Sequence, residues 1–183
     1  MLLIALVLNA VMFAVETTAG LLGQSTGLLA DGLDMLADAS AYAVALWAVG
    51  RSARFKAGAA TLSGSLLVVL GLGVLADVVR RAFVGTEPEG ALMVGVAAVA
   101  LAVNWTVLRL LARVRDGEVH LRATWIFTRA DVVANAAVIV SGLLVLATGL
   151  RWLDLMVGAG IGAYVIREAV EILGQARAAR GQA

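Results

Sequence analysis

Three aspartates interrupt an otherwise apolar stretch of the chain, residues 28–47. The stretch is long enough to cross a bilayer as a helix, although it carries Asp31, Asp34 and Asp38. A carboxylate near the bilayer centre has an insertion cost of at least about 2.5 kcal/mol, so it is by default a candidate functional residue. Asp34 and Asp38 are four residues apart and share one face of a helix. Two oxygen groups that point the same way form half of a cation site.

A second stretch repeats this spacing of oxygen donors. DVVANAAVIV, from Asp131, resembles DMLADASAYAV, from Asp34, and places Asn135 four residues after Asp131. At a rise of ~1.5 Å per residue, Asp38 lies about 15 Å from one face of a ~30 Å core and Asp131 about 13 Å from the other. The same count puts Asn135 level with Asp34. Similar depth is what one shared midplane site requires.

Four further polar residues inside apolar stretches are interpreted as supporting groups: Asn9, Glu16, Asp31 and Asn104. Hydrogen bonds between helices explain buried asparagines well. They explain three carboxylates at one depth poorly, because like charges repel unless they are protonated or bridged by a cation. We therefore favour a cation site over structural cross-linking for the aspartates.

Polar residues near the ends of the apolar stretches have a simpler explanation. Asp77, Arg167, Glu168 and Glu171 are expected to pair at helix ends or to extend toward the headgroups. Asp154 has the position of a structural acidic residue in the first turn of a helix. None of these residues is predicted to bind a metal.

The composition places the chain among integral membrane proteins. Of its 183 residues 62% are hydrophobic, against about 45–50% in soluble domains, and the mean hydropathy is +0.97. The net charge of +1 implies no nucleic acid or other strongly charged partner. Absence of Cys excludes disulfides and thiolate metal sites, and a single His leaves little room for an imidazole-rich zinc site.

Hydropathy predicts an all-α fold with six transmembrane helices. The apolar segments are residues 2–22, 28–50, 57–79, 90–112, 122–148 and 153–175. We expect residues 1–175 to form one transmembrane domain and residues 176–183 a short cytoplasmic tail.

Lys and Arg residues predict the orientation of these segments. One side receives Arg51, Arg54, Lys56, Arg109, Arg113, Arg115, Arg122, Arg177 and Arg180, and the other Arg80, Arg81 and Arg151. Because cytoplasmic loops are richer in basic residues, both termini are expected in the cytoplasm of a multi-pass plasma (inner) membrane protein.

The order of the segments resembles the cation diffusion facilitator family of six-span, usually proton-coupled exporters of divalent metals. LNAVMFAVETTAGLLGQSTGLLADGLDMLAD is similar to the opening of the family's domain. RSARFKAG and ADVVRRA resemble the entry and exit of its third span, LAVNWTVLRLLAR its fourth span, and WLDLMVG the start of its sixth. The resemblance covers nearly the whole chain.

The resemblance implies a metal site made of two residue pairs, on spans two and five. Each pair is His or Asp followed by Asp four residues later, and Asp34 with Asp38 fits the first in its Asp form. Asp131 takes the second place of the other pair, whereas the first place falls on Phe127, which cannot bind a metal. We expect Asn135, one turn beyond Asp131, to substitute for it.

The resemblance also implies a short form without the family's cytoplasmic C-terminal domain. If the chain forms a homodimer, its contacts are then expected between membrane helices. Pairs of small residues, Gly158 with Gly162 and Gly64 with Gly71, allow close helix contact. The sequence leaves open whether that contact lies between subunits or within one.

We predict a secondary transporter that exports a divalent cation in exchange for protons, with the metal as cargo and no resident cofactor. Oxygen-only ligands favour Mn²⁺ and Fe²⁺, and Zn²⁺, the family's commonest substrate, also accepts carboxylates. The chain has no nucleotide-binding loop and no nucleophile–base constellation, so no enzyme is expected. The alternatives are a passive cation channel or proton pathway lined by the same carboxylates, and a membrane scaffold that transports nothing.

Overall fold

The computed structural model describes residues 2–47, 50–112 and 119–181, without the side chains of residues 53, 110–112, 119–130 and 180–181. These ranges contain six helices and no strand, so the all-α prediction is confirmed. The helices are α1 (Leu2–Leu22), α2 (Thr26–Trp47), α3 (Ala53–Val84), α4 (Gly90–Ala112), α5 (Val119–Thr148) and α6 (Trp152–Gly181).

The helices cover five of the six predicted apolar segments and extend beyond several of them. Helix α2 ends at Trp47, before the expected end at residue 50, and residues 48–49 lie outside the described residues. Helix α3 has 32 residues and α6 has 30, more than the ~20 that a bilayer needs. Because α6 continues to Gly181, residues 176–181 of the expected tail are helical.

Four of the six helices are apolar enough to cross a membrane, whereas α2 and α6 are interrupted by charged residues. Helices α1, α3, α4 and α5 each contain a stretch long and apolar enough to cross a membrane. Any 18-residue window of α2 includes Asp31, Asp34 and Asp38. Helix α6 carries Asp154 in its first turn, and its second half carries both acidic and basic residues. The fold is that of an all-α, multi-pass membrane protein whose interior receives charged residues from several helices, among them Glu16 of α1, Asp34 of α2 and Asp131 of α5.

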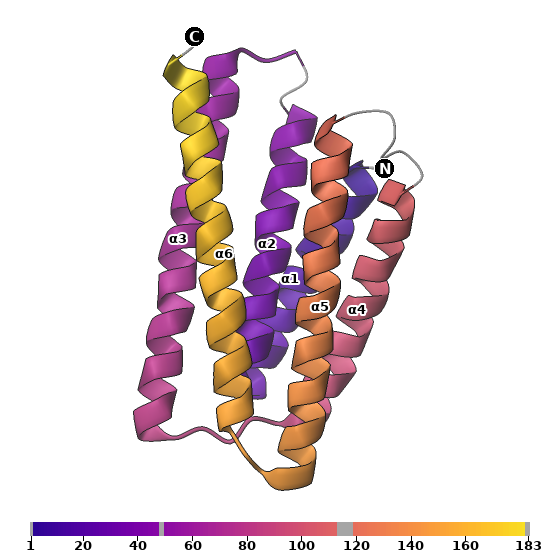
Figure 1. The fold of residues 1–183 in the computed structure, drawn as a ribbon, viewed down its shortest axis with the longest axis vertical. Coiled ribbons are helices and arrows are strands. Elements are labelled where there is room, and N and C mark those ends of the chain that lie inside the picture. The colour runs from indigo at the N-terminus through magenta and orange to yellow at the C-terminus, as the bar shows by residue number, and fades with distance from the viewer. Residues whose placement is uncertain (1, 48–49, 113–118, 182–183) are drawn as a thin grey trace.

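Helix α2 occupies the middle of the bundle and contacts every other helix (Figure 1). The helices alternate in direction, and α1 begins at the same end of the bundle at which α6 ends (Figure 1). Helix α5 contacts α2 and runs antiparallel to it, as the sequence predicted. The residues in the middle of α2 can therefore meet residues in the middle of α5.

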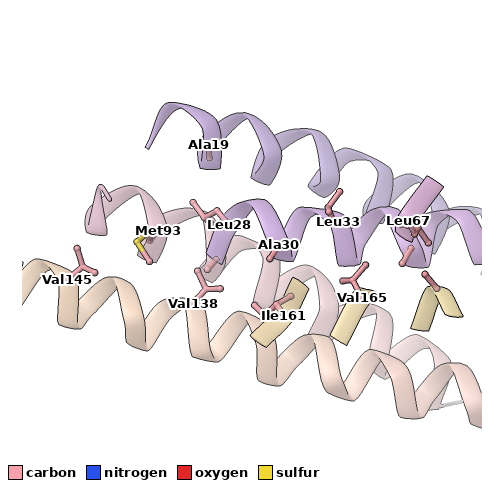
Figure 2. Packing of buried hydrophobic residues seen from close by; sticks show 13 residues of the cluster. Ala19, Leu28, Ala30, Leu33, Leu67, Met93, Val138, Val145, Ile161 and Val165 are labelled. Atoms are coloured by element: carbon pink, nitrogen blue, oxygen red, sulfur yellow. The ribbon is translucent and has the colours of Figure 1, made fainter. Parts of the chain in front are cut away.

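The largest apolar cluster draws buried side chains from all six helices (Figure 2). Leu28 and Leu33 of α2 lie in it beside Val138 of α5 and Val165 of α6. Large apolar side chains such as Leu62 and Phe83 are exposed on the outside. An apolar exterior around a partly polar core suits a protein surrounded by lipid.

The glycine pairs noted in the sequence pack within the chain. A Cβ at Gly158 would lie 2.6 Å from Thr26 Oγ1, and one at Gly64 2.9 Å from Leu173 Cγ. Gly71 and Gly162 face α6 and α3 side chains in the same way. These glycines therefore serve packing inside one subunit and give no support to a dimer face.

Asp154 ties the start of α2 to the start of α6. Its carboxylate accepts hydrogen bonds from Ser25 Oγ at 2.6 Å, Thr26 N at 2.7 Å, Thr26 Oγ1 at 2.9 Å and Gly27 N at 3.0 Å. The structural role expected for Asp154 is thus confirmed, but the helix terminus that it caps is that of α2. This contact fixes the end of the bundle opposite the termini.

Candidate metal-binding site

Asp34, Asp38 and Asp131 meet halfway along the bundle. The carboxyl group of Asp131 is within hydrogen-bonding reach of Asp34 and Asp38, both on α2. Asp34 and Asp131 are only 4% and 5% exposed. Each of the three carboxyl groups keeps one oxygen, Oδ2, without a hydrogen-bond partner. Three acidic groups in such contact must share protons or a cation, because three buried negative charges would repel one another.

Asn135 lies in the core, although its amide faces away from this cluster. Its Nδ2 donates to Asp31 Oδ2 at 2.7 Å, and its Oδ1 accepts from Asn104 Nδ2 at 3.1 Å. Asn135 is therefore level with Asp31, one turn from the Asp34 level that the sequence suggested. To bind a metal, Asn135 Oδ1 would have to give up its hydrogen bond from Asn104 Nδ2 and turn toward the ion.

The four predicted supporting residues are all completely buried. Asn9 Nδ2 donates to the Ala5 carbonyl of its own helix at 2.9 Å, while Asn104 joins the chain of bonds to Asp31. The charges of Asp31 and Asp34 act on Glu16, but neither oxygen of Glu16 has a hydrogen-bond partner. The polar groups thus continue from the aspartate cluster toward α1.

Glu168 of α6 lies next to the aspartate cluster, although the sequence predicted that it would pair at a helix end or extend toward the headgroups. Its charge interacts with Asp34, Asp38 and Asp131, and its carboxylate is hydrogen-bonded to Tyr164. Glu168 follows the buried residues Ile161 and Val165 at helical spacing, and that spacing was the signal for an inward position. A fourth acidic group therefore borders the cluster.

Tyr42, one turn beyond Asp38 on α2, was also missed. It is buried and hydrogen-bonded to Asp38. Its spacing from Asp38 repeats that of Asp38 from Asp34, which places all three side chains on one face of α2.

The cluster does not yet have the arrangement of a coordination shell. Among the residues whose side chains are described, no three His, Cys, Asp or Glu groups are placed to hold a metal as they stand. The first member of the expected second pair, Phe127, lies outside the described side chains. Binding would require the carboxyl groups to turn their unpartnered oxygens toward one ion.

Comparisons with known proteins agree with this architecture. A family described as the cation efflux transmembrane domain matches residues 2–178. The metal cation efflux system protein CzcD of Cupriavidus metallidurans is 25% identical over 175 residues, covering 89% of this chain and 55% of that protein. An uncharacterized transporter of Synechocystis, sll1263, is 29% identical over 168 residues, covering 81% of this chain and 53% of that protein.

A plant protein matches a shorter part of the chain. Metal tolerance protein A2 of Arabidopsis thaliana is 34% identical over 123 residues, which cover 60% of this chain and 31% of that protein. The chain thus spans about half the length of the bacterial relatives.

Proposed function

This chain belongs to the cation efflux family, and we propose that it exports a divalent metal cation through a site built on Asp34, Asp38 and Asp131. The family is one of transporters, which agrees with the absence of an enzyme motif in the sequence. The named activity of CzcD, metal cation efflux, supports the same class of substrate.

The observation that carries the proposal is the convergence of three carboxyl groups from two antiparallel helices. They lie in the middle of the bundle, where Asp34 and Asp131 are almost fully buried and Asp38 is partly buried, and each keeps an oxygen without a partner. A divalent cation would remove their mutual repulsion and provide the missing partner for those oxygens. A purely structural, protonated cluster would relieve the repulsion but would leave those oxygens without a partner.

Exchange for protons follows from the chemistry of the same groups. Without a metal, burial and mutual repulsion favour the protonated carboxyl groups, and an arriving cation displaces those protons. A movement of α2 and α5 relative to the rest of the bundle would then expose the site to the other side. There protons would displace the metal, so that a proton gradient drives export.

The ligand set favours hard or borderline ions. Asp34, Asp38 and Asp131 supply only oxygen, which suits Mn²⁺ and Fe²⁺, and Zn²⁺ accepts the same ligands. We propose Asn135 Oδ1 as the fourth, neutral ligand once it exchanges Asn104 for the ion. Glu168 is the charged alternative from α6, because it already interacts with all three aspartates.

The distribution of basic residues supports an inner-membrane orientation with both termini in the cytoplasm. Arg80, Arg81 and Arg151 lie at the end of the bundle opposite the termini, where Arg81 donates to the Gln24 carbonyl. More Lys and Arg residues belong to the other end. A homodimer, if formed, would use other lipid-facing surfaces than the packed glycines.

Proteoliposomes test the proposed function directly. Uptake of Mn²⁺, Fe²⁺, Zn²⁺ and Mg²⁺ should be measured with and without an imposed pH gradient. A coupled exporter accumulates one or more of the transition metals only when the gradient is present. Metal flux that is the same with and without the pH gradient would indicate a passive channel. Absence of flux for every ion would indicate a scaffold.

A further inference from the structure

A second group of buried oxygens lies next to the aspartate cluster, between α1 and α2. Glu16 and Asp31 are both completely buried. Glu16 Oε1, Glu16 Oε2 and Asp31 Oδ1 have no hydrogen-bond partner, and the remaining oxygen, Asp31 Oδ2, accepts from Asn135. The charges of Glu16 and Asp31 act on one another. Two fully buried, interacting carboxyl groups with three unpartnered oxygens are the core of this group.

Gly32 allows α1 to come this close to α2. A Cβ at Gly32 would lie 2.9 Å from Thr17 Oγ1, 3.2 Å from Thr17 N and 3.3 Å from Glu16 Cβ. The first separation is shorter than real Cβ contacts and the other two are tight, so a side chain at this position would push α1 and α2 apart. The glycine therefore allows Glu16 to lie against α2. The approach occurs next to Asp31, the neighbour of Gly32 in the sequence, and at Glu16 and Thr17 of α1.

Neutral oxygen donors accompany the two carboxyl groups. Thr17 Oγ1 and Asn104 Oδ1 are also buried without a partner, and the Asn104 amide reaches Asp31 through Asn135. Buried polar groups in proteins are nearly always hydrogen-bonded, so unpartnered oxygens on Glu16, Asp31 and the residues beside them call for a ligand that accepts their lone pairs. A cation is such a ligand.

We infer that Glu16 and Asp31 form a second cation position, completed by the neutral oxygens of Asn104 and Thr17. Two carboxylates balance the charge of one divalent ion, and oxygen-only donors suit a hard cation such as Mn²⁺. Asp31 is one turn nearer the end of the bundle opposite the termini than Asp34. In terms of the proposed function, on which this role rests, the position receives the ion after it leaves the aspartate cluster.

Mn²⁺ binding to the purified protein in detergent, measured by electron paramagnetic resonance at fixed pH, tests the inference. The parent should bind two Mn²⁺ per chain. Glu16→Gln should bind one, with the other weakened at least about tenfold, which corresponds to about 1.4 kcal/mol. Asp131→Asn should also bind one, and the double variant should bind none. Glu171→Gln, the same change at an exposed position of α6, should bind as the parent does.

Folding is checked by gel filtration, and Asp31→Asn provides a second variant that preserves the acceptor for Asn135. Parent-like binding by both Glu16→Gln and Asp31→Asn would overturn the second position. A different result would also overturn it: the parent binds a single Mn²⁺, and Asp131→Asn and Glu16→Gln each abolish that binding. One shared site would explain this result.

The two proposals fail separately. One Mn²⁺ that is lost only in Asp131→Asn refutes the second position and leaves the proposed function intact. One Mn²⁺ that is lost only in Glu16→Gln supports the second position and refutes the aspartate cluster as the metal site.

Discussion

Asp154 and Asp131 are both buried aspartates, and their surroundings differ completely. Asp154 is fully buried, and its two oxygens receive four hydrogen bonds from residues 25–27. Asp131 is nearly as buried, but it meets other carboxyl groups and retains an oxygen without a partner. The two aspartates are therefore similarly buried, but only Asp154 has hydrogen-bond donors for both of its oxygens.

The difference shows which buried charge holds the fold and which is available for a ligand. A carboxylate with a full set of donors is stabilised by them and has no remaining capacity for a cation. An unsatisfied carboxyl group in the same medium lowers stability and persists where it serves another purpose. The number of hydrogen bonds therefore separates two kinds of buried aspartate. Asp154 is a structural clamp that holds the start of α2 to α6, whereas Asp131 belongs to the candidate site in the middle of α2 and α5.

Removing the clamp should have the largest effect on stability. Asp154→Ala leaves Ser25 Oγ, Thr26 N and Gly27 N buried without an acceptor, so we expect a loss of about 3 kcal/mol or more in the free energy of unfolding. Asp131→Ala should leave that free energy within about 1 kcal/mol of the parent or raise it, because a repulsive group is removed. Denaturant unfolding in detergent measures both, and equal losses would erase the distinction between the two aspartates.

The close contact beside the clamp should have the next largest effect. Gly158→Ala places a Cβ 2.7 Å from the Thr26 backbone carbon, so α6 and α2 must separate and stability should fall by about 1–3 kcal/mol. Gly160 lies on the same helix with nothing within 4 Å of its would-be Cβ. Gly160→Ala should therefore be neutral or stabilising by up to about 1 kcal/mol. Similar melting temperatures for the two variants would contradict the assigned contact.

Substitution of Asn135 tests whether a hydrogen-bonded neighbour of the aspartate cluster influences metal binding. Asn135→Leu removes the donor to Asp31 and the acceptor for Asn104, so apparent metal affinity in transport should fall about 10–100-fold, as for residues that orient ligands. Transport at saturating metal should persist, because the three aspartates remain. An unchanged affinity would make Asn135 a helix–helix hydrogen bond without influence on the ion.

Glu168 should have the smallest effect of these residues. It acts on the aspartates through charge and is partly exposed, so Glu168→Gln should change apparent metal affinity by less than about tenfold. Glu171→Gln, one turn further along α6 and exposed, provides the matched control. Loss of all transport in Glu168→Gln alone would make Glu168 a ligand and the fourth member of the site.

Local sequence patterns were sufficient to predict the helices and the acidic face of α2. Apolar runs located all six helices, and the spacing of Asp34 and Asp38 placed both on one face. Contacts between distant segments were beyond such patterns. Asp154 meets Thr26 across 128 residues, and Asn135 meets Asp31 across 104. The level of Asn135 shifted by a turn because helix starts cannot be read from hydropathy within that margin.

Metal uptake by proteoliposomes containing Asp131→Asn tests the central claim most directly. The substitution preserves the size of the side chain and removes one of the three charges that converge at the site. Under a proton gradient, the initial rate of metal uptake should fall to that of protein-free liposomes, while the variant remains monodisperse and as heat-stable as the parent. A parent-like rate in the folded variant would contradict the account, because the ion would then cross the membrane without the carboxylate cluster.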